Sequence, residues 1–386
     1  MLNKKITLTV SSFISMYFLG VGGTIIGATA KNIGLSPYQI GIILAVQNTG
    51  FIISVVVSGS LSDSMSKTRL LSIGSFILAV SFILFYRVPN FLINSILMFF
   101  IGFGTGIYEG TTDPMMLEIH ETNKNLYINV NHFFVNIGSL TITVYLIFLS
   151  LNWRKATIQA GILVFLQSIL YLFLNIDNQS ISRLSLLKRV KHITKDLKRL
   201  VILFLLTVFA VGLETSTIGI LTSFLMDIKG FTQITSKIGL IIFISGIASG
   251  RLLIGYISKK FKLLLILMVF LISSSFIYLV LFFTDVGSFT YPIIYLSGFS
   301  ISVLFPILIT ITGLIYSDMS GTALGLIKMG IPVGGIVIPL IISILTKYWN
   351  FRQSLIIFPI IGIIGFSLIF LNYKSLKKSL LVKNAA

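Results

Sequence analysis

Two carboxylates stand in a stretch of the chain that is otherwise apolar enough to cross a membrane. Glu109 and Asp113 lie between Gly102 and Pro114, and they are four residues apart. On a helix this spacing puts both side chains on one face, with Cβ atoms about 6 Å apart. Two acids this close resist carrying two negative charges, so they favour sharing one proton. Ionisable groups are costly inside a membrane, and this pair is therefore a candidate functional site.

The composition indicates a membrane protein with several spans. Of the 386 residues, 55% are hydrophobic and only 10% are charged. The apolar runs are continuous over about 20 residues, which suits helices and excludes barrel strands, since those alternate over about 10 residues. Twelve runs are expected to span, near residues 6–28, 38–58, 70–86, 91–117, 126–150, 156–176, 199–225, 236–257, 262–283, 291–316, 321–346 and 352–373. The predicted fold class is an all-α membrane protein with twelve transmembrane helices.

The basic residues indicate the topology. They gather in the loops on the side of the N-terminus, which predicts that both termini are cytoplasmic and that the chain lies in the plasma (inner) membrane. This topology also explains the formal net charge of +18, so we expect no nucleic-acid partner. The absence of cysteine excludes disulfides and thiolate metal sites.

The chain divides into two similar halves. We expect a six-helix bundle over residues 1–176, a basic cytoplasmic linker over 177–198 that contacts anionic lipids, and a second six-helix bundle with a short tail over 199–386. Similar residues recur at an offset of 196, such as Gly102 with Gly298 and Trp153 with Trp349. Both tryptophans are expected to anchor the protein at the membrane interface. Parallel repeats of six spans are typical of pseudosymmetric transporters with a central site.

The loop after the second span carries a recognisable motif. Gly59 is followed by Asp63, and then by the bases Lys67 and Arg69. This pattern resembles the signature of the major facilitator superfamily in that loop. Asp63 is interpreted as a conformational switch at the cytoplasmic gate, with a solvated loop charge as the alternative.

The fourth span strengthens the resemblance. Tyr108, Glu109, Asp113 and Pro114 resemble the pattern of the fucose permease branch, in which a Glu is followed by Asn-Pro. Later spans agree loosely, including the fifth, which begins with polar and aromatic residues and continues to Gly138. The resemblance implies the major facilitator fold and a role for Glu109 in proton and sugar coupling. Asp113 departs from it, because it stands where the pattern has Asn, and we expect it to act as the neighbour of Glu109 in proton coupling.

Three further charges lie within spans. Glu214 is expected in the outer half of span 7 and Arg251 near the inner end of span 8. Arg251 is therefore interpreted as a gate residue rather than a ligand of the solute. Lys328 in span 11 is expected either to neutralise Glu109 or Asp113 or to reach the inner headgroups.

Several uncharged groups could bind a hydroxylated solute. They are Gln47 and Asn48 in span 2, and Asn131, His132 and Asn136 in span 5. His132 could equally relay protons or be a satisfied core histidine. Glu118, His120 and Glu121 follow span 4, where we expect a solvated face rather than a metal site. No cofactor and no metal are expected.

The leading hypothesis is a proton-coupled importer of a small neutral polyhydroxylated solute, expected to be a monosaccharide, that works as a monomer by alternating access. The predicted solute contacts include Glu109, Glu214 and Lys328. The alternative is a proton antiporter that exports amphipathic compounds. A membrane receptor is disfavoured, because the chain has no soluble signalling domain, and no catalytic motif suggests an enzyme.

Overall fold

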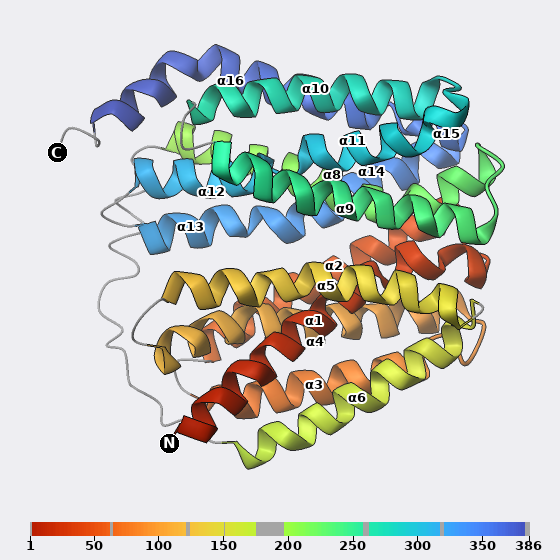
Figure 1. Ribbon diagram of the computed structural model, residues 1–386, viewed down its shortest axis with the longest axis vertical. Helices are drawn as coiled ribbons and strands as arrows, with labels where there is room; N and C mark the ends of the chain where they lie inside the picture. The colour runs from red at the N-terminus through yellow and green to blue at the C-terminus, as the bar shows by residue number, and fades with distance from the viewer. Residues whose placement is uncertain are drawn as a thin grey trace. The chain divides into compact units, whose positions relative to one another are not determined.

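The computed structural model describes residues 2–61, 65–120, 124–149, 151–174, 197–257, 262–316 and 320–382, and these ranges are almost entirely helical (Figure 1). Within them, 12 helices are long and apolar enough to cross a membrane, and no strand occurs. Helices are the natural outcome for such apolar runs, because every backbone polar group must be paired inside a bilayer. The predicted all-α fold with twelve spans is confirmed.

The helices form two compact units, and the first is made mainly of residues up to Ser182. Its helices are α1 (Leu2–Ile33), α2 (Pro37–Leu61), α3 (Lys67–Leu84), α4 (Phe91–Ile119), α5 (Lys124–Phe148) and α6 (Trp153–Phe173). The strongest packing pairs α1 with α5, α2 with α4, and α3 with α6.

The second unit holds the remaining spans. They are α8 (Leu197–Asp227), α9 (Gln233–Ile257), α10 (Leu263–Phe283), α11 (Thr290–Ile301), α12 (Leu304–Ile315), α13 (Ser320–Lys328), α14 (Gly330–Tyr348) and α16 (Ile357–Val382), with the short helices η2 (Gly287–Phe289) and α15 (Phe351–Ser354). The first residues of α9, up to Lys237, group with the first unit. Here α8 packs on α14 and α10 on α16.

The packing inside each unit repeats. A Cβ atom on Gly102 would lie 1.8 Å from the carbonyl oxygen of Gln47, so α2 and α4 touch backbone to backbone. In the second unit, a Cβ on Gly298 would lie 2.1 Å from the carbonyl oxygen of Phe243, which brings α9 equally close to α11. Both residues of this contact are displaced by the same 196 positions. The internal repeat predicted from the sequence therefore extends to equivalent helix contacts.

Two spans of the second unit are broken by proline. Pro306 lacks an amide proton, and in a continuous helix its ring would clash with the carbonyl of Ser302, four residues earlier. Ser302 is the C-cap residue at which α11 ends. In the same way, Pro332 would clash with the carbonyl of Lys328, and Lys328 is the last residue of α13. Lys328 therefore stands at a helix end within its span.

The structure bears on two further expectations, the basic linker and the two tryptophans. Most of the predicted linker lies outside the described residues, and its last two positions, Leu197 and Lys198, already belong to α8. Trp153 was expected to anchor the protein at the membrane interface, but only 5% of it is exposed, and it packs inside the unit against Phe85 and Tyr86. Trp349 is 50% exposed, as an interfacial residue would be.

Candidate functional site

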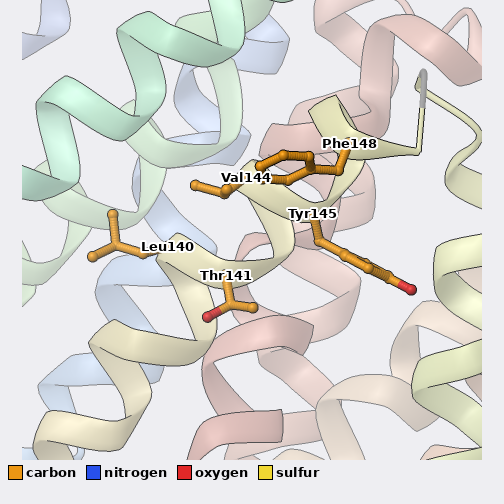
Figure 2. A pocket seen from close by; sticks show the side chains of 5 residues that line it. All are labelled: Leu140, Thr141, Val144, Tyr145 and Phe148. Atoms are coloured by element: carbon orange, nitrogen blue, oxygen red, sulfur yellow. The ribbon is translucent and has the colours of Figure 1, made fainter.

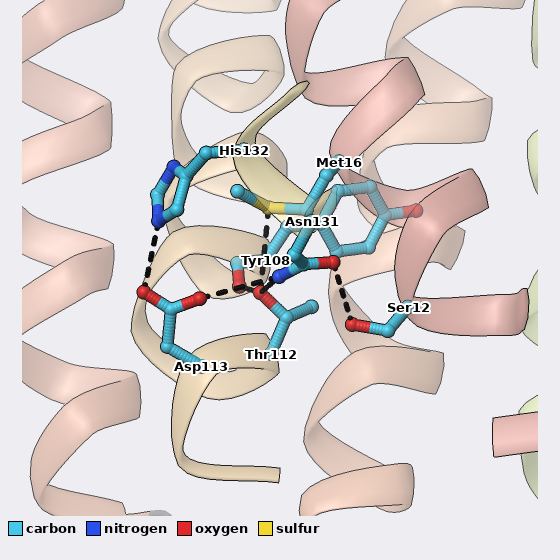
Figure 3. Close-up of polar contacts among 7 residues, drawn as sticks. All are labelled: Ser12, Met16, Tyr108, Thr112, Asp113, Asn131 and His132. Carbon is cyan, nitrogen blue, oxygen red and sulfur yellow. Dashed lines mark hydrogen bonds and ion pairs between the residues drawn. The ribbon is translucent and has the colours of Figure 1, made fainter. Parts of the chain in front are cut away.

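Three ionisable side chains of the first unit converge between α4 and α5. The carboxylates of Glu109 and Asp113 and the imidazole of His132 offer oxygen and nitrogen atoms that all lie within 4.8 Å of one another. His132 Nε2 lies 3.0 Å from Asp113 Oδ2, and Figure 3 shows the two side chains facing each other. The side chains of Asp113 and His132 are 16% and 37% exposed, so the group is only partly covered by its unit. We call these three residues the acid–histidine cluster.

Helix periodicity explains how α4 presents both acids. Asn90 caps α4 by accepting a hydrogen bond from the amide of Ile93, and the helix then continues through Pro114 to Ile119. Glu109 and Asp113, one turn apart, thus share a face. The predicted pairing of the two acids is consistent with this geometry.

Asn131 fixes the position of Asp113. Its Oδ1 accepts a hydrogen bond from Ser12, 3.0 Å away, and its Nδ2 donates to Asp113 Oδ1 and to Thr112 Oγ1, each at 3.2 Å (Figure 3). Asn131 is fully buried, and these contacts satisfy its oxygen and both amide protons. The sequence placed Asn131 among the solute ligands, but the structure places it inside the unit, where it ties α1 and α5 to the carboxylate on α4.

The other amides predicted to bind solute are also engaged by the protein. Gln47 is 6% exposed and donates to the carbonyl of Gly22, while Asn48 donates to the carbonyl of Leu44 in its own helix. Asn136 is half-buried on α5, one turn beyond His132. The donor protons of Gln47 and Asn48 are thus partly used within the first unit.

The second unit contains its own charged centre. One guanidinium nitrogen of Arg251 lies 2.9 and 2.8 Å from the two carboxylate oxygens of Glu214, and both side chains are less than one-third exposed. The sequence expected these residues at different depths, with Glu214 as a solute ligand and Arg251 at the gate. That separation was wrong, because the long arginine side chain bridges α9 to α8.

The predicted roles of Lys328 and Asp63 stay predictions. Lys328 is half-buried at the end of α13, and its pairing with Glu109 or Asp113 stays a prediction. Asp63 lies outside the described residues, so its role as a switch also stays a prediction.

The structure also contains a largely buried ion pair that was not predicted from the sequence. Lys67 Nζ, at the start of α3, lies 2.5 Å from Glu118 Oε1 near the end of α4, and their side chains are 5% and 14% exposed. Glu118 was expected on a solvated face, and that expectation was wrong. Lys67 belongs to the basic part of the loop motif, which was the available signal.

His120 is likewise buried. Only 4% of it is exposed, its ring stacks on Tyr127, and its Nε2 lies 2.9 Å from Thr9 Oγ1. The Thr9 hydroxyl also lies 2.9 Å from the carbonyl of Lys5; when its proton is donated there, His120 Nε2 is the donor to Thr9. Burial, followed by the nearby Lys5 ammonium, lowers the pKa of His120.

An apolar pocket lies farther along α5. It is lined by Leu140, Thr141, Val144, Tyr145 and Phe148 (Figure 2). Leu140 and Tyr145 point to opposite sides of the helix, and the tyrosine hydroxyl donates to Gln159 on α6. Eight residues, or about 12 Å of helix, separate Leu140 from His132. The two hydroxyls of the lining, on Thr141 and Tyr145, both donate to other residues, and the rest of the surface is carbon, so the pocket suits an apolar group rather than proton chemistry.

The comparisons with known proteins agree with this architecture. The model of the Major Facilitator Superfamily matches residues 8–323. No curated protein matches the chain. A bacterial homolog of the human lysosomal transporter Spinster, in an inward-facing and occupied conformation, is 14% identical with a TM-score of 0.80, and the match covers 96% of this chain and 97% of that one.

Two further structures belong to proteins whose names include a nucleoside or a sugar. A mutant of the nucleoside transporter NupG is 14% identical with a TM-score of 0.81, over 95% of this chain and 99% of that one. A mutant of the E. coli fucose:proton symporter FucP is 15% identical with a TM-score of 0.63, over 94% of this chain and 97% of that one. At such identities these likenesses show the fold, whereas the family model covers most of the chain. The chain belongs to the Major Facilitator Superfamily and is thus an integral membrane transporter of small solutes rather than an enzyme.

Proposed function

We propose that this protein is a proton-coupled importer of a small neutral polyhydroxylated solute, most simply a monosaccharide. The observation that carries the proposal is the acid–histidine cluster, in which Glu109, Asp113 and His132 meet within 4.8 Å on two apolar spans. Carboxylates that are placed in apolar spans at such cost, and that are only partly covered, are suited to binding and releasing a proton. Glu109 is the proposed carrier, because the family pattern also points to it.

The proposed cycle follows from charge. When a proton binds to the cluster, it removes one negative charge from an apolar environment and lowers the cost of enclosing the site. The two halves can then exchange access between the two sides of the membrane. Release of the proton restores the charge and favours reopening. Asn131 and His132 keep Asp113 in place through the cycle, because both donate to its oxygens when the imidazole Nε2 carries a proton.

The solute class is supported by relatives. The nucleoside transporter and the fucose:proton symporter, by their names, both carry neutral solutes rich in hydroxyl groups. Carboxylates and imidazole can bind hydroxyl groups, as can the half-buried Asn136. In the second unit, Glu214 and Lys328 are the proposed solute contacts, and Arg251, which is bonded to Glu214, is the proposed gate residue.

The experiment has two steps. Purified protein is first screened by thermal unfolding against monosaccharides, polyols and nucleosides at two pH values, because a ligand stabilises the state it binds. Uptake of the stabilising solute is then measured in proteoliposomes. We expect Glu109→Gln to abolish accumulation driven by a pH gradient while leaving exchange of solute across the membrane. The control is Asp285→Asn, because that carboxylate is 89% exposed. Unchanged uphill uptake in Glu109→Gln would defeat the proposal.

A second candidate is a proton antiporter that exports amphipathic cations. Two observations favour it. Gln47 and Asn48 donate to backbone carbonyls rather than to a solute, and the acid–histidine cluster has two acids that could attract a cation. The apolar pocket on α5 would suit the carbon portion of such a compound. Expression would then raise cellular resistance to tetraphenylphosphonium, whereas a sugar importer would leave resistance unchanged.

A further inference from the structure

We propose that the acid–histidine cluster also binds a divalent metal ion of the zinc class. The sequence offered no metal site, because the acids and the histidine lie on different helices. The fold brings together one atom each from Glu109, Asp113 and His132 within 4.8 Å. Two carboxylates and one imidazole are a common ligand type for borderline first-row metals.

The distances are close to those of a metal shell. Zinc bonds to nitrogen and carboxylate oxygen are about 2.0–2.2 Å long, so neighbouring ligand atoms are about 3–3.5 Å apart. Asp113 Oδ2 and His132 Nε2 already lie 3.0 Å apart. A carboxylate oxygen of Glu109 lies within 4.8 Å of both atoms, on a side chain with three rotatable bonds.

A second observation supports the site. Asp113 Oδ1 accepts a hydrogen bond from Asn131, which is itself held by Ser12 on α1. The other oxygen, Oδ2, faces the imidazole. Ligating carboxylates are typically held in this way by an outer partner that fixes their orientation. Asp113 is therefore preorganised, and binding would cost little rearrangement at this ligand.

Charge and ligand type indicate which ion would bind. Two carboxylates and a neutral imidazole carry two negative charges, which a divalent cation neutralises fully. Calcium and magnesium prefer shells made only of oxygen, whereas imidazole favours zinc, nickel and copper. Three protein ligands leave a coordination position for water or for a hydroxyl group of the solute. The metal would occupy the carboxylates that the proposed function assigns to the proton, but its binding can be measured without transport.

The test is calorimetric titration of ZnCl₂ into the full-length protein, purified without a histidine tag and treated with a chelator. The background is low, because the chain has no cysteine and only three histidines. We expect one zinc ion per chain, no comparable binding of MgCl₂, and at least a tenfold loss of affinity in both His132→Gln and Glu109→Gln. His120→Gln is the matched control, since that imidazole already bonds Thr9, and we expect it to retain wild-type affinity.

Thermal unfolding of each variant confirms that it is folded before titration. An absence of zinc binding to the wild type, or wild-type affinity in His132→Gln, would overturn the metal site. The result is separable from the proposed function. If zinc binds and uphill uptake is unchanged in Glu109→Gln, the metal site stands and proton coupling through Glu109 is rejected. If zinc does not bind and Glu109→Gln loses uphill uptake, proton coupling stands and the metal site is rejected.

Discussion

At the scale of single residues, the network around Asp113 shows what the side chains do for one another. The Asn131 oxygen accepts a hydrogen bond from α1, and its amide nitrogen donates two to α4. The residue type predicted a polar role correctly. The direction of the side chain was not predictable from the sequence, because Asn131 and His132 are adjacent and only the rotation of α5 decides which of them is buried.

Removing the Asn131 amide tests this role. We expect Asn131→Ala to lower the free energy of unfolding by about 1–3 kcal/mol, because it removes the hydrogen bonds that Asn131 makes to Ser12, Thr112 and Asp113. The matched control is Asn48→Ala, whose amide bonds only its own helix and should change stability by less than about 0.5 kcal/mol. Thermal unfolding in detergent compares the two, and equal losses would argue against a positioning role.

His120 supplies a prediction on pH. Its pKa is lowered in the folded protein by burial and then by Lys5, so the unfolded chain binds the proton more readily. Stability is therefore fully present above the ordinary histidine pKa of about 6.5 and is lost as the pH falls toward the lower folded value. We expect the unfolding temperature of the wild type to fall more between pH 7.5 and pH 5.5 than that of His120→Gln. Parallel curves would show that His120 does not contribute.

At the scale of elements, glycine contacts and ion pairs set how the helices meet. The repeat of Gly102 and Gly298 was visible in the sequence, and it corresponds to backbone contacts in both units. Proline breaks were harder to predict. Pro114 and Pro339 lie inside continuous helices, whereas Pro306 and Pro332 follow interruptions. The presence of a proline alone therefore does not predict where a span is interrupted.

The close contact at Gly102 predicts a sharp effect of a single methyl group. In Gly102→Ala the new Cβ would lie 1.8 Å from the carbonyl oxygen of Gln47, so α2 and α4 must separate. We expect a loss of about 1–3 kcal/mol in unfolding free energy. Gly23→Ala on α1 is the control, since nothing lies within 4 Å of its added Cβ, and it should gain about 0.5–1 kcal/mol from helix propensity. A neutral Gly102→Ala would contradict the observed spacing.

The Glu214–Arg251 pair predicts non-additive behaviour. Either Glu214→Gln or Arg251→Gln leaves a partly buried charge without its partner, at a cost below the roughly 3–5 kcal/mol known for fully buried pairs. The double variant removes both charges and should recover part of that loss. Thermal unfolding of the three variants gives the coupling, and purely additive losses would show that the pair is not an energetic unit. The pair was not predictable from the depths of Glu214 and Arg251 along their spans, because depth gives only the backbone position and the arginine side chain is long.

At the scale of the whole molecule, apolar run length alone predicted the twelve spans, since a bilayer permits few alternatives. The orientation predicted from the basic residues, with both termini in the cytoplasm, can be tested directly, because the protein has no cysteine of its own. We expect a maleimide that cannot cross membranes to label Val88→Cys on intact cells, and to label Ser379→Cys only after permeabilisation. The opposite pattern would place the termini outside.

The central claim is that solute movement is coupled to protons through Glu109, and solute-driven proton movement tests it most directly. Proteoliposomes loaded with a pH-sensitive dye receive the solute that stabilises the purified protein, with no pH gradient imposed. The account predicts acidification of the interior with the wild type and none with Glu109→Gln, although that variant still exchanges solute. Solute entry into wild-type vesicles without any change in internal pH would contradict the claim.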